Sequence, residues 1–179
     1  MEHTTAPWDY RVLQHDHYYG KDEYNNDEDY DGYWGIWDAP FLQYITTVLD
    51  EKHPPFFSSI FTVSSHDPYK VPHELHSLFK KGHVPMHRSA QYSDYALNKF
   101  FEKAKKSDWY DHTIFLFTAD HSNQSHFPFY KKTLNRFANP FMLFDPKARY
   151  KGTNLQIGQH IDIYPTLVEL MQYDQPFRS

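Results

Sequence analysis

A carboxylate and two imidazoles follow one apolar stretch of the chain. The stretch is TIFLFTA (113–119), and Asp120, His121 and His126 come after it. A carboxylate oxygen and an imidazole nitrogen are suitable ligands for a divalent cation such as Zn²⁺ or Mn²⁺. Neighbouring side chains of a strand point to opposite faces, so Asp120 and His121 can share an ion only where the chain has turned.

The dipeptide alone favours a simpler interpretation, a solvated turn in which Asp120 caps the next segment. His126 shifts the balance toward a metal or substrate site, because the polar loop 122–125 can fold it back toward Asp120 and His121.

A third imidazole follows another apolar stretch. His66 comes directly after FFSSIFTVSS (56–65), which is rich in the aromatic and β-branched residues of buried strands. Histidines that follow two different strands would then lie at one edge of a sheet. The alternative is a surface histidine before the Asp67-Pro68 turn, and it stays open. His87 and His160 precede predicted helices, where capping is the ordinary explanation.

The acidic N-terminal region suggests a second type of site. Asp27, Asp29, Asp31 and Gly32 match the start of an EF-hand loop, with Asp38 at the position of its last ligand. No amphipathic helix precedes this loop, its last ligand is aspartate rather than glutamate, and two tryptophans crowd its middle. Calcium binding there is therefore a minor alternative.

Composition excludes several classes of function. Eighteen basic and 23 acidic residues give a net charge of -5, so no basic face is available for nucleic acid. The absence of cysteine excludes disulfides, thiolate metal sites and a cysteine nucleophile. The sequence contains no GxSxG motif and no glycine-rich phosphate loop. No apolar run approaches the roughly 18 residues of a membrane span.

The elements that must position these residues alternate between helix and strand. Apolar periodicity predicts helices over 40–52, 87–106 and 162–173, and continuous apolar runs predict strands over 56–65, 113–119 and 140–144. This order predicts an α/β fold with a mainly parallel sheet flanked by helices, and such sheets carry their chemistry at the carboxyl ends of strands. Residues 1–34 are predicted to be an irregular, acidic, tyrosine-rich segment, and 35–179 to be the domain.

Four motifs occur in an informative order: TVSSHDPYKVP, YSDYALNKFFEKAKKSDWYDHTIFLFTADHSN, NPFMLFDP and HIDIYPTLVELM. Together they resemble the C-terminal part of sulfatase-like members of the alkaline phosphatase superfamily. The resemblance is strongest to the lipoteichoic acid synthase and phosphoglycerol transferase branch. It extends from about residue 15 to the end of the chain.

The resemblance implies a metal-dependent transferase or hydrolase of phosphate or sulfate esters. By motif, Asp120 and His121 would be metal ligands. His66 would contact the phosphoryl group or protonate the leaving group, and His126 would face the substrate. Trp34 would line a glycerol-phosphate pocket. Mn²⁺ or Zn²⁺ is the expected cofactor, with Ca²⁺ and Mg²⁺ as alternatives.

The family's N-terminal half, which carries the nucleophile, has no counterpart in these residues. We therefore expect the chain to be the C-terminal portion of a larger enzyme, incomplete at its N-terminus and inactive alone. The expected substrate is a phosphate or sulfate ester, which a lipid or glycan can carry. Upstream helices would hold the enzyme at the extracytoplasmic face of the cell membrane. The alternative is a non-catalytic module that binds a glycan or a partner protein through the aromatic residues of 8–44.

Overall fold

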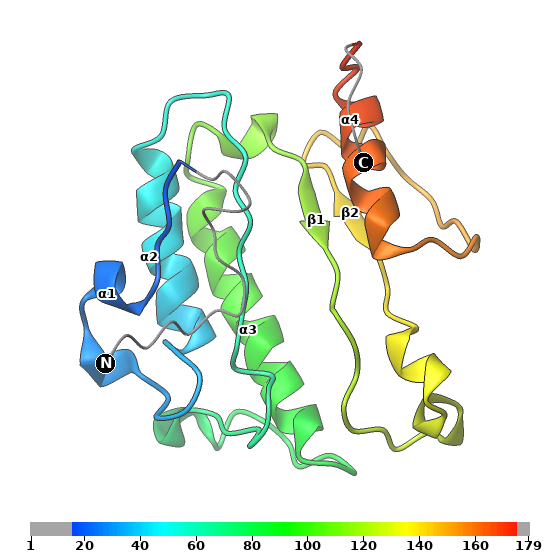
Figure 1. Cartoon of the computed structure of the whole chain (residues 1–179). Helices are drawn as coiled ribbons and strands as arrows, with labels where there is room; N and C mark the ends of the chain where they lie inside the picture. Colours follow the sequence, from blue (N-terminus) through cyan, green and yellow to red (C-terminus); the bar gives the residue numbers. More distant parts are fainter. Residues whose placement is uncertain (1–15, 175–179) are drawn as a thin grey trace. The chain divides into compact units, whose positions relative to one another are not determined.

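The computed structural model describes residues 16–174, which fall into two compact units divided after Ala148. Two packed helices, α2 (Asp38–Asp50) and α3 (Met86–Ala104), form the centre of the first unit (Figure 1). They confirm the helices predicted over 40–52 and 87–106.

The core lies between α2 and α3 because each helix carries an apolar stripe. On α3, Tyr92, Ala96 and Ala104 are fully buried and Phe100 is nearly so, at a spacing of four residues. The two alanines allow a close approach of α2, which contributes Leu42, Ile45 and Leu49 to the same cluster. Trp109 and Tyr110 complete that cluster. The second cluster consists of Val71, Phe79 and Tyr92.

A small sheet follows α3 in the sequence. Strand β1 (Phe115–Phe117) pairs with β2 (Met142–Phe144) in an antiparallel register, with Leu116 opposite Leu143. The aromatic ring of Phe101 anchors the sheet on α3, because its centroid lies 5.2 Å from that of Phe115 and 5.5 Å from that of Phe144.

This sheet differs from the mainly parallel one that the sequence predicts. Within residues 16–174 the sheet has two strands and they are antiparallel. A parallel crossover generally needs a helix between the strands. Residues 118–141 contain only two short 3-10 helices, η4 (Pro128–Lys131) and η5 (Leu134–Phe137), and return the chain beside β1.

The strand predicted over 56–65 is also wrong. These residues form no ladder, and Phe57 and Phe61 are 70% and 74% exposed. Side-chain bonds to the buried Asp38, described below, hold the end of this segment instead.

The remaining elements of the first unit are short. They are α1 (Lys21–Tyr24) and the 3-10 helices η1 (Asp27–Asp29), η2 (His73–Leu75) and η3 (Tyr110–His112). An isolated bridge joins Tyr30 to Ile36. The part of the predicted irregular segment from residue 16 onward thus contains two brief helical turns, while residues 1–15 lie outside the described structure.

The second unit contains η6 (His160–Asp162) and α4 (Ile163–Leu170). Together they confirm the helix predicted over 162–173, with Pro165 in the first turn, where its missing N–H costs no hydrogen bond. Val168 is the residue of α4 that is buried. Across residues 16–174, no helix combines the length and the apolar character needed to cross a membrane.

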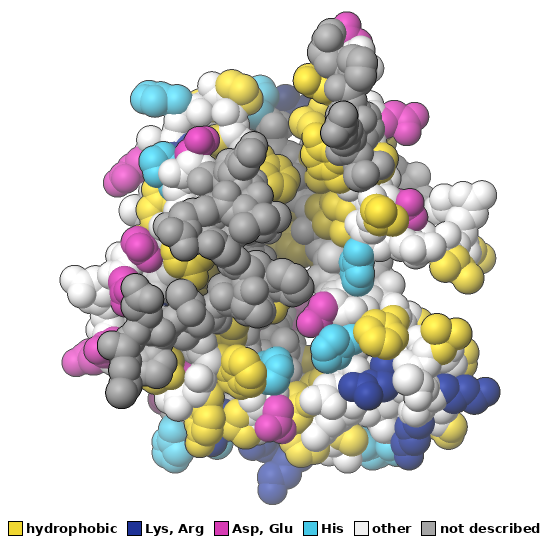
Figure 2. Space-filling model, in the orientation of Figure 1, with side chains coloured by type: hydrophobic (Ala, Val, Ile, Leu, Met, Phe, Trp, Pro, Cys, Tyr) yellow, Lys and Arg dark blue, Asp and Glu magenta, His cyan; other side chains and the backbone are white. Residues whose placement is uncertain are grey.

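Large apolar side chains also lie on the surface (Figure 2). Phe127, Leu134 and Phe137 are 62%, 82% and 61% exposed. The region that follows β1 therefore has little apolar core of its own. Polar contacts hold its backbone.

Candidate functional site

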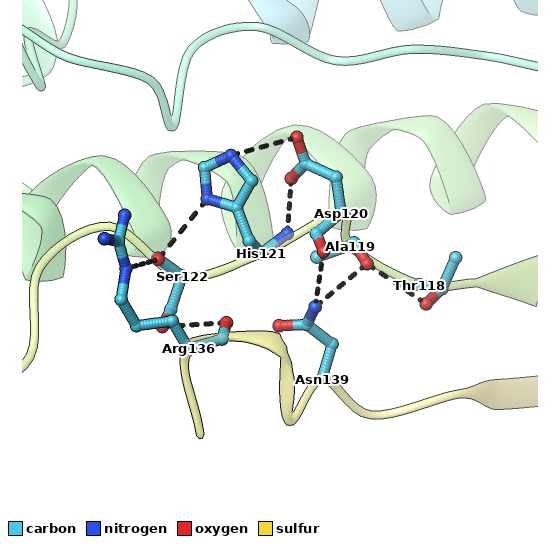
Figure 3. Close-up of polar contacts among 7 residues, drawn as sticks. All are labelled: Thr118, Ala119, Asp120, His121, Ser122, Arg136 and Asn139. Carbon is cyan, nitrogen blue, oxygen red and sulfur yellow. Dashed lines mark hydrogen bonds and ion pairs between the residues drawn. The ribbon is translucent and has the colours of Figure 1, made fainter. Parts of the chain in front are cut away.

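Asp120 and His121 occupy the turn that follows β1. The His121 N–H donates a hydrogen bond of 2.7 Å to Asp120 Oδ1, and His121 Nε2 lies 3.5 Å from Asp120 Oδ2 (Figure 3). Both side chains thus lie on one side of the turn, as the sequence prediction required. The Asp120 side chain is 68% exposed and that of His121 is 40% exposed, so both are open to a ligand from solvent.

Residues of the segment that leads back to β2 hold this turn in place. The Asn139 side-chain amide donates to the carbonyl oxygens of Ala119 at 3.1 Å and Asp120 at 2.9 Å. Ser122 N donates to Arg136 O at 2.8 Å, and Arg136 Nε donates back to Ser122 O at 3.2 Å (Figure 3). These bonds hold the backbone on both sides of Asp120 and His121.

The spacing of the two side chains fits a bound divalent cation. Metal bonds to imidazole nitrogen and carboxylate oxygen are about 2.1 Å long, so two ligands in a tetrahedral shell lie about 3.4 Å apart. The observed separation between His121 Nε2 and Asp120 Oδ2 is 3.5 Å. Within residues 16–174 no cluster of three or more histidine or acidic side chains is placed to hold an ion, so these two residues would supply part of a coordination shell.

His66 and Trp34 form a second pair. Their ring centroids are 4.0 Å apart, and Trp34 Nε1 donates a hydrogen bond of 2.6 Å to Asp67 O. Asp31 Oδ1 accepts hydrogen bonds from the backbone N–H groups of Tyr33, Trp34 and Gly35. This carboxylate therefore orients the tryptophan that covers His66.

A buried carboxylate holds the segment that carries His66. Asp38 is 2% exposed, and its Oδ1 accepts from Val63 N at 2.9 Å and Ser64 N at 3.0 Å. Ser93 Oγ donates to Oδ2 at 3.2 Å, while Asp38 N donates to Ser64 Oγ at 3.0 Å. Sequence reasoning missed this positioning role, although an aspartate at the start of an apolar helix was a signal that could have revealed it.

The EF-hand alternative is wrong for physical reasons. Asp38 is the buried positioning residue just described, and Asp31 accepts three hydrogen bonds from its own loop. Asp29 accepts from the Tyr24 hydroxyl and the Asn26 amide, and Asp27 pairs with a lysine. The carboxylates of this region therefore stabilise local turns instead of converging on an ion.

His126 stacks on a histidine that sequence reasoning had not singled out. Its ring lies 3.9 Å from that of His83, with 10° between the ring planes. Desolvation, together with the neighbouring His83, His87 and Lys131, lowers the pKa of the His126 imidazole. The neutral imidazole is thereby favoured, and a neutral imidazole can accept a proton or a hydrogen bond.

The sequence-predicted residues thus form three local groups: Asp120 with His121, Trp34 with His66, and His126 with His83. Tyr69 lies near the loop that carries the first group. It follows the His66 turn, with Tyr69 N donating to His66 O at 2.8 Å, and its hydroxyl lies beside Asn123 and Arg136. Burial, with Asp67 nearby, raises the pKa of this hydroxyl. Convergence of all three groups on one substrate stays a prediction.

Comparison with known proteins supplies the family. The sulfatase family model matches residues 3–173, nearly the whole chain. The chain belongs to the sulfatase family. A crystal structure of a protein in the alkaline phosphatase superfamily from Vibrio parahaemolyticus aligns with a TM-score of 0.68 and 31% identity, over 84% of this chain and 37% of that one. This neighbour supports the predicted alkaline phosphatase superfamily fold.

Curated relatives of this sulfatase-family chain agree with the resemblance in the sequence. Lipoteichoic acid synthase 1 of Bacillus subtilis is 25% identical over 92% of the chain. Lipoteichoic acid synthase of Staphylococcus saprophyticus is 25% identical over the same share. The chain spans 28% of the length of each of these two relatives. The predicted recognition of this family and branch is therefore confirmed.

Proposed function

We propose that this chain contributes a metal-binding and substrate-binding part to a phosphoester or sulfoester transferase or hydrolase of the phosphoglycerol transferase type. The observation that carries the proposal is the 3.5 Å separation of Asp120 Oδ2 and His121 Nε2 in the exposed turn after β1. Membership of the sulfatase family supports the ester chemistry. Similarity to lipoteichoic acid synthases supports the branch.

In the proposed mechanism, Asp120 and His121 would hold a divalent cation, Mn²⁺ or Zn²⁺, with Ca²⁺ and Mg²⁺ as alternatives. When bound, the cation would neutralise charge on the non-bridging oxygens of the ester and lower the pKa of a coordinated hydroxyl. Asn139 and Arg136 would keep the turn in place while the ester binds, through their bonds to the backbone on either side.

The histidines would handle protons and substrate oxygens. His66 would donate a hydrogen bond to the phosphoryl group or, as a general acid, a proton to the departing alkoxide. Trp34 would restrict the His66 ring and form one wall for the alcohol part of the ester. His126, which favours its neutral form, would accept a hydrogen bond or a proton from the substrate. The attacking nucleophile is assigned to no residue of this chain.

By the same analogy, we propose that the working enzyme acts at the extracytoplasmic face of a bacterial cell membrane on a lipid- or glycan-linked ester. Its remaining coordination shell and its membrane anchor would come from sequence other than these 179 residues. Nucleic acid has no part in this role.

Cleavage of bis(4-nitrophenyl) phosphate tests the proposal in a protein that joins this chain to the N-terminal half of a related enzyme. We expect Mn²⁺- or Zn²⁺-dependent release of nitrophenol, lost in Asp120→Ala and His121→Ala. Asp111→Ala is the matched control, because Asp111 is exposed and lies before β1. Full activity in Asp120→Ala would contradict the metal-ligand assignment.

A glycan-binding module is the second candidate, and one observation favours it. Tyr18, Tyr33 and Trp34 are 41%, 52% and 45% exposed, and exposed aromatic faces bind sugars. Titration of the chain with a glycan in the presence of EDTA separates the two proposals. Saturable binding without metal, lost in Tyr33→Ala, would support the glycan module over the enzyme.

A further inference from the structure

A cavity of about 290 Å³ lies at the start of α3. The proposed function leaves this cavity without a ligand. Its walls are formed by Tyr69, Lys81, Gly82, His83, Val84, Pro85 and Arg88. This volume is near the lower limit of ordinary ligand pockets, which suits a small polar ligand.

The lining of the cavity is basic. Lys81 and Arg88 are cationic residues, the His83 imidazole can donate a hydrogen bond, and no lining residue is acidic. Within residues 16–174, no carboxylate forms an ion pair with Lys81 or Arg88. By contrast, Lys99, which lies on α3 like Arg88, pairs with Glu102 at 2.8 Å. The cations of the cavity are therefore available to an anionic ligand.

Arg88 gives the most specific indication. Its Nε is buried and has no hydrogen-bond acceptor. A buried donor without an acceptor is destabilising, so rotation of the Arg88 side chain toward an oxyanion in the cavity would supply the acceptor that Nε lacks. The first backbone donors of α3 are already used, because His87 N donates to Val84 O and Arg88 N donates to Pro85 O. The cationic side chains of the lining are therefore the donors that an anion would meet.

Two contacts connect the cavity with the candidate site. His83 stacks on His126 at 3.9 Å between ring centroids, and Tyr69 N donates to the carbonyl oxygen of His66. Gly82 lets the cavity lining pack directly against His87, because a Cβ at position 82 would collide with the His87 side chain. The cavity thus borders residues proposed to face the substrate.

We propose that this cavity is an oxyanion subsite that binds a phosphate or sulfate group through Lys81, His83 and Arg88. In the working enzyme it would hold a second anionic group of the substrate while another is at Asp120 and His121. That extension rests on the proposed function, whereas binding of the oxyanion itself does not.

Titration of the ¹⁵N-labelled 179-residue chain with inorganic phosphate in EDTA tests the subsite by NMR. We expect saturable shifts of the Gly82, His83 and Arg88 amides, and at least about tenfold weaker binding in Lys81→Gln and Arg88→Gln, since charge-assisted hydrogen bonds to an oxyanion are strong. Lys80→Gln removes the same charge one residue away from the cavity lining and should bind as the wild type does. Lys81 is exposed, so its replacement should leave the fold intact.

A second arm separates this inference from the proposed function. Asp120→Ala should lose metal-dependent ester cleavage in the joined enzyme and keep the phosphate shifts at the cavity. Glycerol 3-phosphate should bind there as inorganic phosphate does if the cavity recognises the oxyanion. Absence of saturable shifts, equal affinity in Lys81→Gln, Arg88→Gln and Lys80→Gln, or loss of the shifts in Asp120→Ala would overturn the subsite.

Discussion

Replacement of Asp38 by alanine should unfold the segment that carries His66. The change removes the acceptor of two backbone N–H groups, those of Val63 and Ser64, and of the Ser93 hydroxyl. An unsatisfied buried donor costs about 1–3 kcal/mol, so the two backbone groups together give about 2–6 kcal/mol. Val63 is only partly buried, so the free-energy cost of its unpaired N–H should be near the lower end of the range of about 1–3 kcal/mol. Since a domain has about 5–15 kcal/mol of stability, the loss should be large.

Urea unfolding measures this loss, and the His66 amide resonance reports the local effect. Asp38→Asn keeps the shape and one carbonyl oxygen, so it should cost about 1 kcal/mol and leave the His66 resonance near its wild-type position. Asp94→Ala is the control, because Asp94 is exposed on α3 and surface changes usually stay within about 0.5 kcal/mol. A urea midpoint for Asp38→Ala equal to that of Asp94→Ala would show that the Asp38 carboxylate does not hold the 63–66 segment.

Three further predictions concern His126, Ala96 and Trp34. The pKa of His126 in the folded chain is below the ordinary value near 6.5, mainly through desolvation, so its stabilising contribution should be complete above that pH and decline as pH falls through the folded pKa. An NMR titration should give a higher pKa for His126 in His83→Ala, which removes the stacked ring, and an unchanged value would contradict the contribution of His83. Ala96→Leu should destabilise by about 1–3 kcal/mol in urea unfolding, because Ala96 is fully buried against α2; wild-type stability would argue against the helix contact. Trp34→Phe keeps the ring and loses the hydrogen bond to Asp67 O, so it should raise KM in the joined enzyme less than Trp34→Ala does, and equal effects would exclude a role for the ring.

The helices were predictable from the sequence because their apolar residues recur at helical spacing. Tyr92, Ala96 and Phe100 define one buried face without reference to other segments. The sheet was less predictable. An apolar run such as 140–144 indicates extended structure, but its direction depends on the connection that precedes it. The 56–65 run depends even more on distant residues, since a carboxylate at residue 38 holds its end.

The candidate site was predictable where its parts are adjacent in sequence. Asp120 and His121 need only a turn to lie together, and that turn occurs. The stacking of His126 on His83 and of Trp34 on His66 joins residues far apart in the chain, which no local pattern encodes. The basic cavity lies mostly within residues 81–88, with Tyr69 as the one distant lining residue. It was missed because a short basic stretch before a helix does not by itself indicate a hollow in the surface.

Titration of the labelled chain with Mn²⁺, read as paramagnetic broadening of its amide and imidazole resonances, tests the proposed metal site most directly. We expect selective broadening at Asp120 and His121 that extends to the His66 ring and is lost in Asp120→Ala. Broadening centred on residues 27–31, or broadening that persists in Asp120→Ala, would contradict it.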